Sequence, residues 1–87
     1  MKTFLITKQH LDSDNYYIWS EDLSNFQGNI EAEEWLWYVK FQTQLTASWY
    51  ISFKAGSWIK AGEWIEAGWW IEAGWWIKAG SWIKAGA

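Results

Sequence analysis

The chain has 87 residues, a net charge of −3 at pH 7, 11 tryptophans and no cysteine. A chain of this length forms one domain, and without cysteine it has neither a disulfide nor a thiolate zinc site. Charged residues interrupt the apolar runs, so no stretch approaches the roughly 18 residues of a membrane span, and the apolar run near the start is too short for a signal peptide. We therefore expect a cytoplasmic protein that does not contact membranes.

Residues 1–27 differ in composition from the rest of the chain. Two apolar stretches, Thr3 to Thr7 and Tyr16 to Trp19, flank the run His10 to Asn15, which is rich in turn-forming residues. Two short apolar stretches around a polar turn are typical of a β-hairpin. We expect an N-terminal hairpin over residues 1–27 that caps the following segment, because a repeat structure needs its terminal unit covered.

A six-residue repeat, Lys/Glu-Ala-Gly-x-Trp-Ile, runs from Lys54 to the end of the chain. So short a period excludes helical-hairpin repeats, whose units take roughly 30 residues or more, and predicts one short strand per unit. Degenerate copies at Ile30 to Leu36 and Leu45 to Ile51 extend the pattern toward the start. We therefore predict an all-β fold, a short single-chain β-solenoid (β-helix) of six-residue repeats over residues 28–87 with the hairpin as its cap.

Strand alternation decides which side chains of the repeat point inward. In Trp58-Ile59-Lys60-Ala61 the Trp and the Lys share one face, and the Ile and the Ala share the other. Burying the repeated lysines and glutamates would cost several kcal/mol for each unpaired ion, so the isoleucines and alanines must face inward. We expect the glycine of each copy to form a corner that requires a positive φ angle.

Two cross-sections of the coil are compatible with the repeat. With three sides, every third copy stacks, so that Lys54 lies over Glu72 and Lys60 over Lys78; with two sides, every second copy stacks and the stacked charges are opposite. Exposed charge pairs contribute only about 0.2 to 1 kcal/mol, so the three-sided form is the leading expectation and the two-sided form stays open. The copy at Lys84 to Ala87 has no visible cap, and its open strand edge favours a homodimer.

The phrase Ile-x-Ala-Gly-x-Trp over residues 28–87 resembles the hexapeptide-repeat proteins, which form left-handed β-helices. It is also similar to short bacterial and phage proteins that carry runs of Ile-Lys-Ala-Gly or Ile-Glu-Ala-Gly. The resemblance implies the architecture and no particular activity. Hexapeptide acyltransferases use a catalytic histidine beside a subunit interface, whereas His10, the single histidine of this chain, lies outside the repeat.

No arrangement of residues predicts an enzyme. His10 has no accompanying serine, cysteine or second histidine in a recognised catalytic pattern. The run Asp12 to Asn15 begins like a calcium loop, but Tyr17 stands where such a loop needs glycine, and the late glutamate is missing. The glycines recur as corners and do not form a phosphate-binding loop. We expect no catalytic residue, no metal and no cofactor.

The tryptophans of the repeat should therefore line the outer surface. Complete burial of one indole side chain is worth about 4 to 6 kcal/mol, at roughly 25 cal/mol per Å² over 150 to 250 Å². A row of exposed indoles is typical of a protein interface, in which nearby charges form the polar rim. The predicted partner-binding residues are Trp58, Trp64, Trp69, Trp70, Trp75, Trp76, Trp82, Glu31, Glu33 and Glu34.

These features suggest a non-catalytic protein-binding module that acts through the Trp face, the acidic N-terminal end, or both. A small phage-type inhibitor of a bacterial defence protein, such as an anti-CRISPR protein, is one form that the small size and the acidity favour. The alternatives are indoles that only stabilise the coil, and a self-assembling structural protein that forms a homodimer through its C-terminal coil or Trp face. Direct binding of nucleic acid is not expected, because the lysines and glutamates of the repeat nearly cancel.

Overall fold

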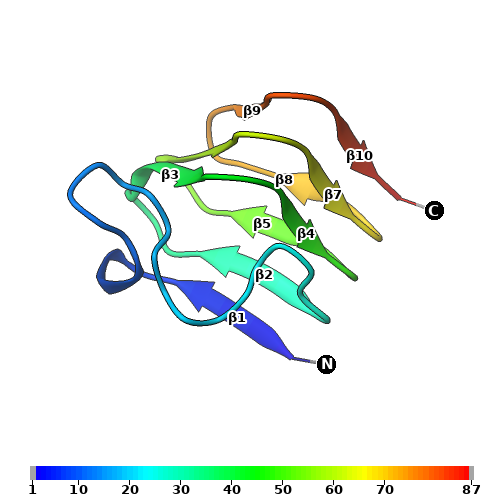
Figure 1. Cartoon of the computed structure of the whole chain (residues 1–87), viewed down its shortest axis with the longest axis horizontal. Helices are drawn as coiled ribbons and strands as arrows, with labels where there is room; N and C mark the ends of the chain where they lie inside the picture. Colours follow the sequence, from blue (N-terminus) through cyan, green and yellow to red (C-terminus); the bar gives the residue numbers. More distant parts are fainter. Residues whose placement is uncertain (1, 87) are drawn as a thin grey trace.

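A computed structural model of the chain describes residues 2–86 and is almost entirely β structure, with its strands in three parallel sheets (Figure 1). The one helical element of the described residues is a 3-10 turn, η1, at Lys8–His10. The strands are β1 (Thr3–Ile6), β2 (Asn29–Ala32), β3 (Trp37–Phe41), β4 (Leu45–Ala47), β5 (Ile51–Phe53), β6 (Ser57–Ala61), β7 (Ile65–Ala67), β8 (Ile71–Glu72), β9 (Ile77–Ala79) and β10 (Ile83–Ala85).

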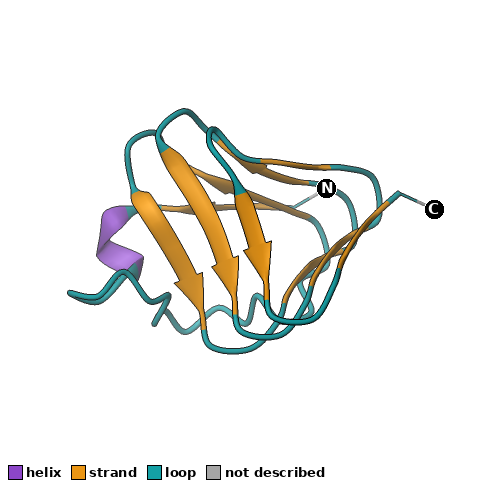
Figure 2. Cartoon of the chain, turned by 90° about the horizontal axis from the view of Figure 1, so that it is seen from above, coloured by secondary structure: helices purple, strands orange, loops and turns teal. Residues whose placement is uncertain are grey.

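From β2 onward the chain visits the three sheets in rotation. The strand orders are β1-β2-β5-β8, β3-β6-β9 and β4-β7-β10, and each neighbouring pair is parallel. Figure 2 shows the three sheets arranged around a shared interior. Ile65 pairs with Ile83, and Ile59 pairs with Ile77, so each residue pairs with its equivalent three copies further along the repeat. The two-sided cross-section, in which every second copy would pair, is therefore wrong.

The spacing between paired strands is wider nearer the N-terminus. Ile51 pairs with Ile71, and Leu45 pairs with Ile65, and both separations exceed three copies of the repeat by two positions. The two additional residues lie between the inward residues Ile51 of β5 and Ile59 of β6, which are eight positions apart instead of six; β6 accordingly begins two positions before its isoleucine, at Ser57. Phe53 is the last residue of β5 and is only 2% exposed, so this strand adds an aromatic side chain to the core.

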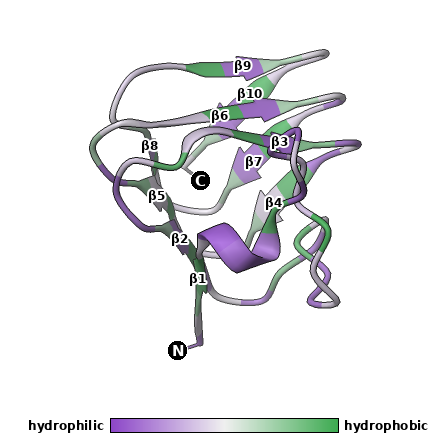
Figure 3. Cartoon of the chain, turned by 90° about the vertical axis from the view of Figure 1, so that its left-hand side faces the viewer, coloured by the Kyte–Doolittle hydropathy of each residue, from purple (hydrophilic) through white to green (hydrophobic). Residues whose placement is uncertain are grey.

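The core consists of the inward residues of the repeat, as the alternation predicts. Ile59 and Ile65 are completely buried, and Ala61 and Ala67 are 2% and 1% exposed. Hydrophobic and hydrophilic positions alternate along strands such as β6 and β9 in Figure 3. Each isoleucine that is buried in this way stabilises the fold by about 1.5 to 3 kcal/mol relative to an exposed one. Burial weakens toward the C-terminus, where Ile83 is 48% exposed.

The opening segment does not form the predicted hairpin. β1 pairs in parallel with β2 as the first strand of its sheet, and Tyr16 to Trp19 contains only isolated bridges. One of these, between Leu11 and Tyr17, is antiparallel. The physical reason is that β2 would otherwise present an unpaired edge, and β1 can cover that edge because its Phe4 and Ile6 side chains pack against the core.

Residues 11–28 cover the first strands of the other two sheets. The Tyr17 N–H donates to the Lys40 carbonyl oxygen on β3 (2.8 Å), and the Phe26 N–H donates to the Thr46 carbonyl oxygen on β4 (2.9 Å). Leu23 and Phe26 are 2% and 3% exposed, so this segment also closes the N-terminal end of the apolar interior. The segment therefore packs against the first strands of two sheets, and its geometry differs from that of the predicted hairpin.

The glycines of the repeat are needed for close approach more than for backbone conformation. Among the corner glycines with a described conformation, only Gly56 and Gly86 have a positive φ, at 76° and 85°, so the expectation of a positive φ at every corner is wrong. A Cβ atom on Gly62 would overlap the carbonyl oxygen of Gln42 in the layer below, and Gly68 and Gly80 lie equally close to the backbone of their neighbouring layers. The absence of a side chain lets successive layers reach the spacing of a β-sheet.

We expect Gly62→Ala to destabilise the protein by about 1 to 3 kcal/mol, because the new methyl group must displace backbone. At a turn with free space the same change would stabilise a protein by about 0.4 to 1 kcal/mol, because alanine reduces the conformational entropy of the unfolded chain. The sign of the change in stability therefore shows whether close packing limits this position. Urea unfolding followed by tryptophan fluorescence measures it. Glu63→Ala, at the exposed neighbouring position, is the matched control and should change stability little; a stabilised Gly62→Ala would contradict the packing explanation.

Candidate functional site

The repeat builds an aromatic column on the outer surface of each sheet. In every copy the residue before the inward isoleucine points outward, and parallel pairing places it over the equivalent residue of the next layer. The column of β3-β6-β9 has ring centroids 4.3 and 4.6 Å apart, and those of β5-β8 and β7-β10 have centroids 4.6 and 5.3 Å apart. The columns are Tyr38-Trp58-Trp76, Tyr50-Trp70 and Trp64-Trp82 respectively.

Stacking within the columns stabilises the fold without hiding the rings. The Tyr50 and Trp70 rings are 7° from parallel, and those of Trp64 and Trp82 are 13° from parallel. Aromatic pairs of this kind contribute about 0.5 to 1.5 kcal/mol each beyond their buried area. The outer rings nevertheless remain accessible, since Trp70 and Trp82 are 42% and 45% exposed. The columns therefore both support the fold and present an apolar surface.

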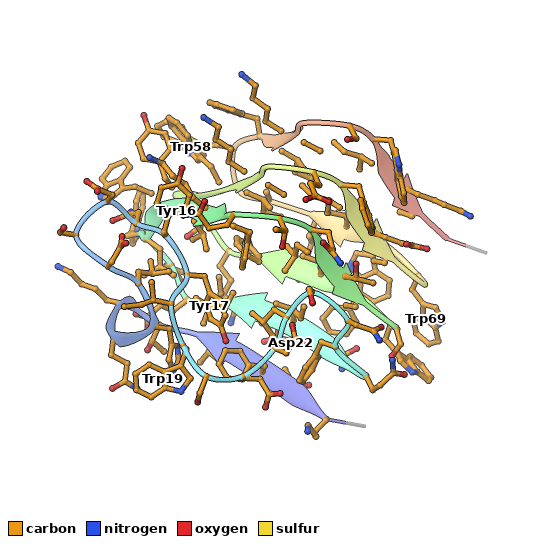
Figure 4. All side chains as sticks on the ribbon, viewed as in Figure 1. Tyr16, Tyr17, Trp19, Asp22, Trp58 and Trp69 are labelled. Carbon is orange, nitrogen blue, oxygen red and sulfur yellow. The ribbon has the colours of Figure 1, made fainter. Side chains whose placement is uncertain are left out.

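Further tryptophans at the corners widen the aromatic surface. Trp69 is 53% exposed and lies 4.2 Å from Trp49, measured between ring centroids. Trp75 is 55% exposed and contacts Trp58 and Trp37 at centroid distances of 5.2 and 6.0 Å. Figure 4 shows Trp58 and Trp69 toward opposite sides of the molecule, so the predicted tryptophans do not form one continuous face.

Beside β3-β6-β9, sequence reasoning missed three exposed aromatic residues, Trp35, Trp37 and Tyr38. They are 57%, 50% and 42% exposed and join the column of β3-β6-β9. They lie outside the perfect copies, and Trp35 and Trp37 have positive φ angles of 62° and 65°, which a strand pattern does not anticipate. A signal was present in the sequence, because three of the four residues in Trp35-Leu36-Trp37-Tyr38 are aromatic.

Parallel pairing also sorts the charges by sheet. The residue after each inward isoleucine forms a second outward column, two positions along the strand from the aromatic one. On β3-β6-β9 this column contains only lysines, on β1-β2-β5-β8 its charged members are both glutamates, and on β4-β7-β10 it carries both signs. The members are Lys40, Lys60 and Lys78; Leu5, Glu31, Ser52 and Glu72; and Thr46, Glu66 and Lys84.

One predicted charge pair is wrong. Lys54 does not lie over Glu72; its place is taken by Ser52, whose hydroxyl donates to the Glu72 carboxylate at 2.7 Å. The cause is the wider spacing from Ile51 to Ile59, which adds two positions to this circuit of the chain through the three sheets. The stacking of Lys60 on Lys78 follows the three-sided expectation.

The three predicted acidic residues separate into two places. Glu31 on β2 accepts a hydrogen bond from the Tyr50 hydroxyl (2.5 Å), and this bond is the main reason that the pKa of Tyr50 is raised. Glu33 and Glu34 lie in the turn after β2, where Glu33 accepts a hydrogen bond from the Lys8 N–H (3.3 Å). Glu31 thus belongs to the aromatic surface over β5-β8, and the other two glutamates do not lie on that column.

A hollow of about 210 Å³ lies between residues 17–24 and 41–44 and was not anticipated from the sequence. Tyr17, Trp19 and Asp22 lie along it in Figure 4. The Tyr17 hydroxyl donates to the Glu21 carbonyl oxygen (2.7 Å), and burial, followed by the charges of Glu21 and Asp22, raises the pKa of Tyr17 to about 12. Hydrogen bonds from Ser24 hold the pKa of Asp22 below its usual value. These polar groups are therefore engaged within the loop.

His10 is buried and packs against aromatic side chains. It is 7% exposed, its Nδ1 accepts a hydrogen bond from the Thr7 N–H (2.9 Å), and its ring lies against Phe4 and Trp19 with centroids 5.0 and 4.7 Å away. Over residues 2–86 no three His, Asp or Glu side chains gather as metal ligands. No helix within the same residues has the length and apolar character that a membrane crossing requires.

Comparison with known proteins does not place the chain in a family. No protein-family model, no curated protein and no solved structure matches it. The assignment of a candidate functional surface therefore depends on geometry and chemistry alone. This surface consists of three outward aromatic columns, and beside each lies a charged or polar column of different composition.

The raised pKa of Tyr17 predicts a loss of stability at high pH. Below the unfolded-state value of 10.0 the phenol is protonated in both states and its contribution is fully present. As the pH rises from about 10 to about 12, the unfolded chain loses the proton first, so the free energy of unfolding falls. Urea unfolding across this range measures the slope. Tyr17→Phe should make the slope of the free energy of unfolding against pH smaller, and the slope that remains includes the contribution of Tyr50. An unchanged slope would contradict the raised pKa of Tyr17.

Proposed function

We propose that the chain is a short β-solenoid that acts as a non-catalytic protein-binding module in the cytoplasm, with its aromatic columns as the contact surface. A small phage-type inhibitor of a bacterial defence protein, of the anti-CRISPR kind, is the form of this function that the small size and the acidic N-terminal half favour. The partner docks on exposed indoles, and the charged columns beside them set its orientation.

The observation that carries this proposal is the amount of indole surface that the fold leaves in contact with water. Five of the seven predicted tryptophans are between 42% and 55% exposed. Covering the remaining half of one indole is worth about 2 to 3 kcal/mol at roughly 25 cal/mol per Å². Monomeric proteins rarely leave large contiguous apolar patches uncovered, and tryptophans dominate the binding energy of many interfaces.

The surface over β5 and β8 has the composition of a docking site for a basic protein. Trp69 and Trp70 are in contact, with centroids 5.8 Å apart, and Trp70 stacks on Tyr50. Glu31 and Glu72 lie on the same sheet in the neighbouring column. Each carboxylate accepts a hydrogen bond from a neutral hydroxyl, so its negative charge is retained. Aromatic anchors beside such carboxylates would bury apolar area and meet lysines or arginines of the partner at the rim.

Replacement of Trp69, Trp70, Trp75 and Trp76 by serine is expected to abolish capture of the partner from a bacterial lysate, because it removes the anchors and retains the buried isoleucines. A pull-down with immobilised protein measures recovery. Circular dichroism should confirm that the variant keeps its β structure. Lys54→Ser with Glu63→Ser, at exposed corner positions, is the control that should recover the partner normally. Equal recovery by the tryptophan variant and the native chain would eliminate the proposal.

Self-assembly is a second candidate that one observation favours. β8, β9 and β10 are the last strands of their sheets within the described residues, and the core beside them is open, since Ile71 and Ile77 are partly buried and Ile83 is 48% exposed. Parallel pairing leaves N–H and C=O groups on the free edge of each strand. A second copy could cover these edges and the open core, which would give a homodimer through the C-terminal coil.

Light scattering of the native chain over a range of concentrations tests self-assembly. We expect the mean mass to rise toward that of a dimer, and Ile83→Lys to keep the protein monomeric, because a buried lysine opposes burial of the open end. Leu5→Lys is the matched control, because Leu5 has a similar exposure of 44% but lies on β1, the first strand of the sheet β1-β2-β5-β8, away from β8, β9 and β10. A native chain that stays monomeric at high concentration would exclude this candidate.

A further inference from the structure

The lysine column of β3-β6-β9 places like charges close together, and no glutamate of the repeat lies in that column. Lys40 pairs with Lys60 and Lys60 pairs with Lys78, so three like charges lie in neighbouring layers. Like charges directly opposite one another on a sheet are destabilising. The glutamates of the repeat lie elsewhere: Glu66 is on β7, Glu72 on β8, and Glu63 in the turn between β6 and β7. A bound polyanion would convert the repulsion into attraction.

A small hollow beside this column has the lining of an anion subsite. It has a volume of about 70 Å³ and lies between Lys40, Lys60 and Tyr16, with Gln42 and Gly62 at its corner. The Nζ atom of Lys40 is 5.2 Å from the centroid of the Tyr16 ring and 5.3 Å from that of Tyr38. These cation–π contacts hold one ammonium group in position before any ligand arrives.

The loop that forms one wall of the hollow is firmly held. The Tyr17 N–H donates to the Lys40 carbonyl oxygen (2.8 Å), and the Asn15 side chain donates to the carbonyl oxygens of Leu36 and Tyr38 (3.0 and 2.8 Å). The nearby Asp12 carboxylate accepts hydrogen bonds from the backbone N–H groups of its own turn. The loop therefore presents Tyr16 to the lysines in a fixed position.

Aromatic rings accompany the lysines along the whole face. On each strand the aromatic residue precedes the lysine by two positions, so the two columns share one face and are about 7 Å apart. The outermost indoles, Trp75 and Trp76, are 55% and 45% exposed. A positive track beside exposed aromatic rings is the arrangement with which proteins bind single-stranded nucleic acid, because phosphates meet the cations and bases stack on the rings.

We propose that the face of β3-β6-β9 binds single-stranded nucleic acid without sequence preference. Lys40, Lys60 and Lys78 contact successive phosphates, and Trp75 and Trp76 stack against bases. The near-cancellation of charge along the repeat argued against such a ligand, but the register removes the glutamates from this column. An acidic polypeptide would satisfy the lysines and leave the aromatic rings without flat partners, so the nucleic acid is favoured. This surface is distinct from the acidic surface over β5 and β8.

Fluorescence anisotropy of a labelled oligo(dT) at low salt tests the proposal. We expect saturable binding, quenching of tryptophan emission by stacked bases, and a slope of log affinity against log salt of about −2, which corresponds to three phosphate contacts on a single strand. Lys60→Glu with Lys78→Glu should weaken binding on the order of tenfold or more. Trp76→Ser should weaken it between about 5- and 150-fold and reduce the quenching.

Matched controls lie on β4-β7-β10, where Lys84 and Trp82 occupy the same positions of the repeat. Lys84→Glu and Trp82→Ser should bind as the native chain does, and circular dichroism should show that all variants fold. Absence of binding to oligo(dT) at low salt, or equal losses in the controls and in the lysine variants, would overturn the proposal. Displacement of the oligonucleotide by polyglutamate of equal length at equal concentration would overturn it in favour of an acidic polypeptide.

Discussion

A charged side chain cannot be buried in an interior lined by isoleucine and alanine, and the rest of the structure depends on this constraint. The repeat carries a lysine or a glutamate at every sixth position, and strand alternation ties each one to the same face as the preceding tryptophan. The indoles are therefore outside because the charges are. Ile59 and Ile65 are completely buried in the interior, while Trp75 and Trp76 remain about half exposed.

Close stacking of the layers turns these outward tryptophans into columns. Gly62, Gly68 and Gly80 let the backbone of one layer rest directly on the carbonyl oxygens of the layer below. The same spacing brings aromatic rings of neighbouring layers into contact, as the parallel rings of Tyr50 and Trp70 show. Stabilisation of the fold and presentation of an apolar surface are consequently two effects of one arrangement, so they are not competing explanations of the tryptophans.

Rotation among three sheets gives each face its own chemistry. The chain passes through all three sheets before it returns to the first, and we call one such passage a circuit. The number of residues in each circuit decides which charges of the repeat lie on β1-β2-β5-β8, β3-β6-β9 and β4-β7-β10. Circuits of three strands, lengthened by two positions between Ile51 and Ile59, place Lys40, Lys60 and Lys78 together and leave Glu31 and Glu72 on another sheet. Circuits of two strands would have paired opposite charges throughout the repeat. The two proposed binding surfaces thus arise from one sequence motif.

The inward or outward direction of side chains in the strands was the most predictable property of this protein. The inward positions of Ile59 and Ala61 and the outward position of Trp76 follow from the alternation of a strand, which is a property of covalent geometry. The parallel pairing of β1 with β2 could not be predicted from residues 1–27, because its cause is the unpaired edge of a strand that comes later in the chain. The exposure of Trp35 and Trp37 was also missed, because Trp35, in the turn after β2, and Trp37, the first residue of β3, both adopt positive φ angles that interrupt the alternation of a strand.

The sequence by itself determined the all-β class, the period of the strands and the identity of the inward and outward side chains, because each of these depends on neighbouring residues only. The tertiary structure alone decided which charges share a face, which tryptophans touch, and why glycine occupies the corners. These features depend on the backbone of one layer meeting that of the next, and two additional positions between Ile51 and Ile59 are enough to exchange Lys54 for Ser52 opposite Glu72.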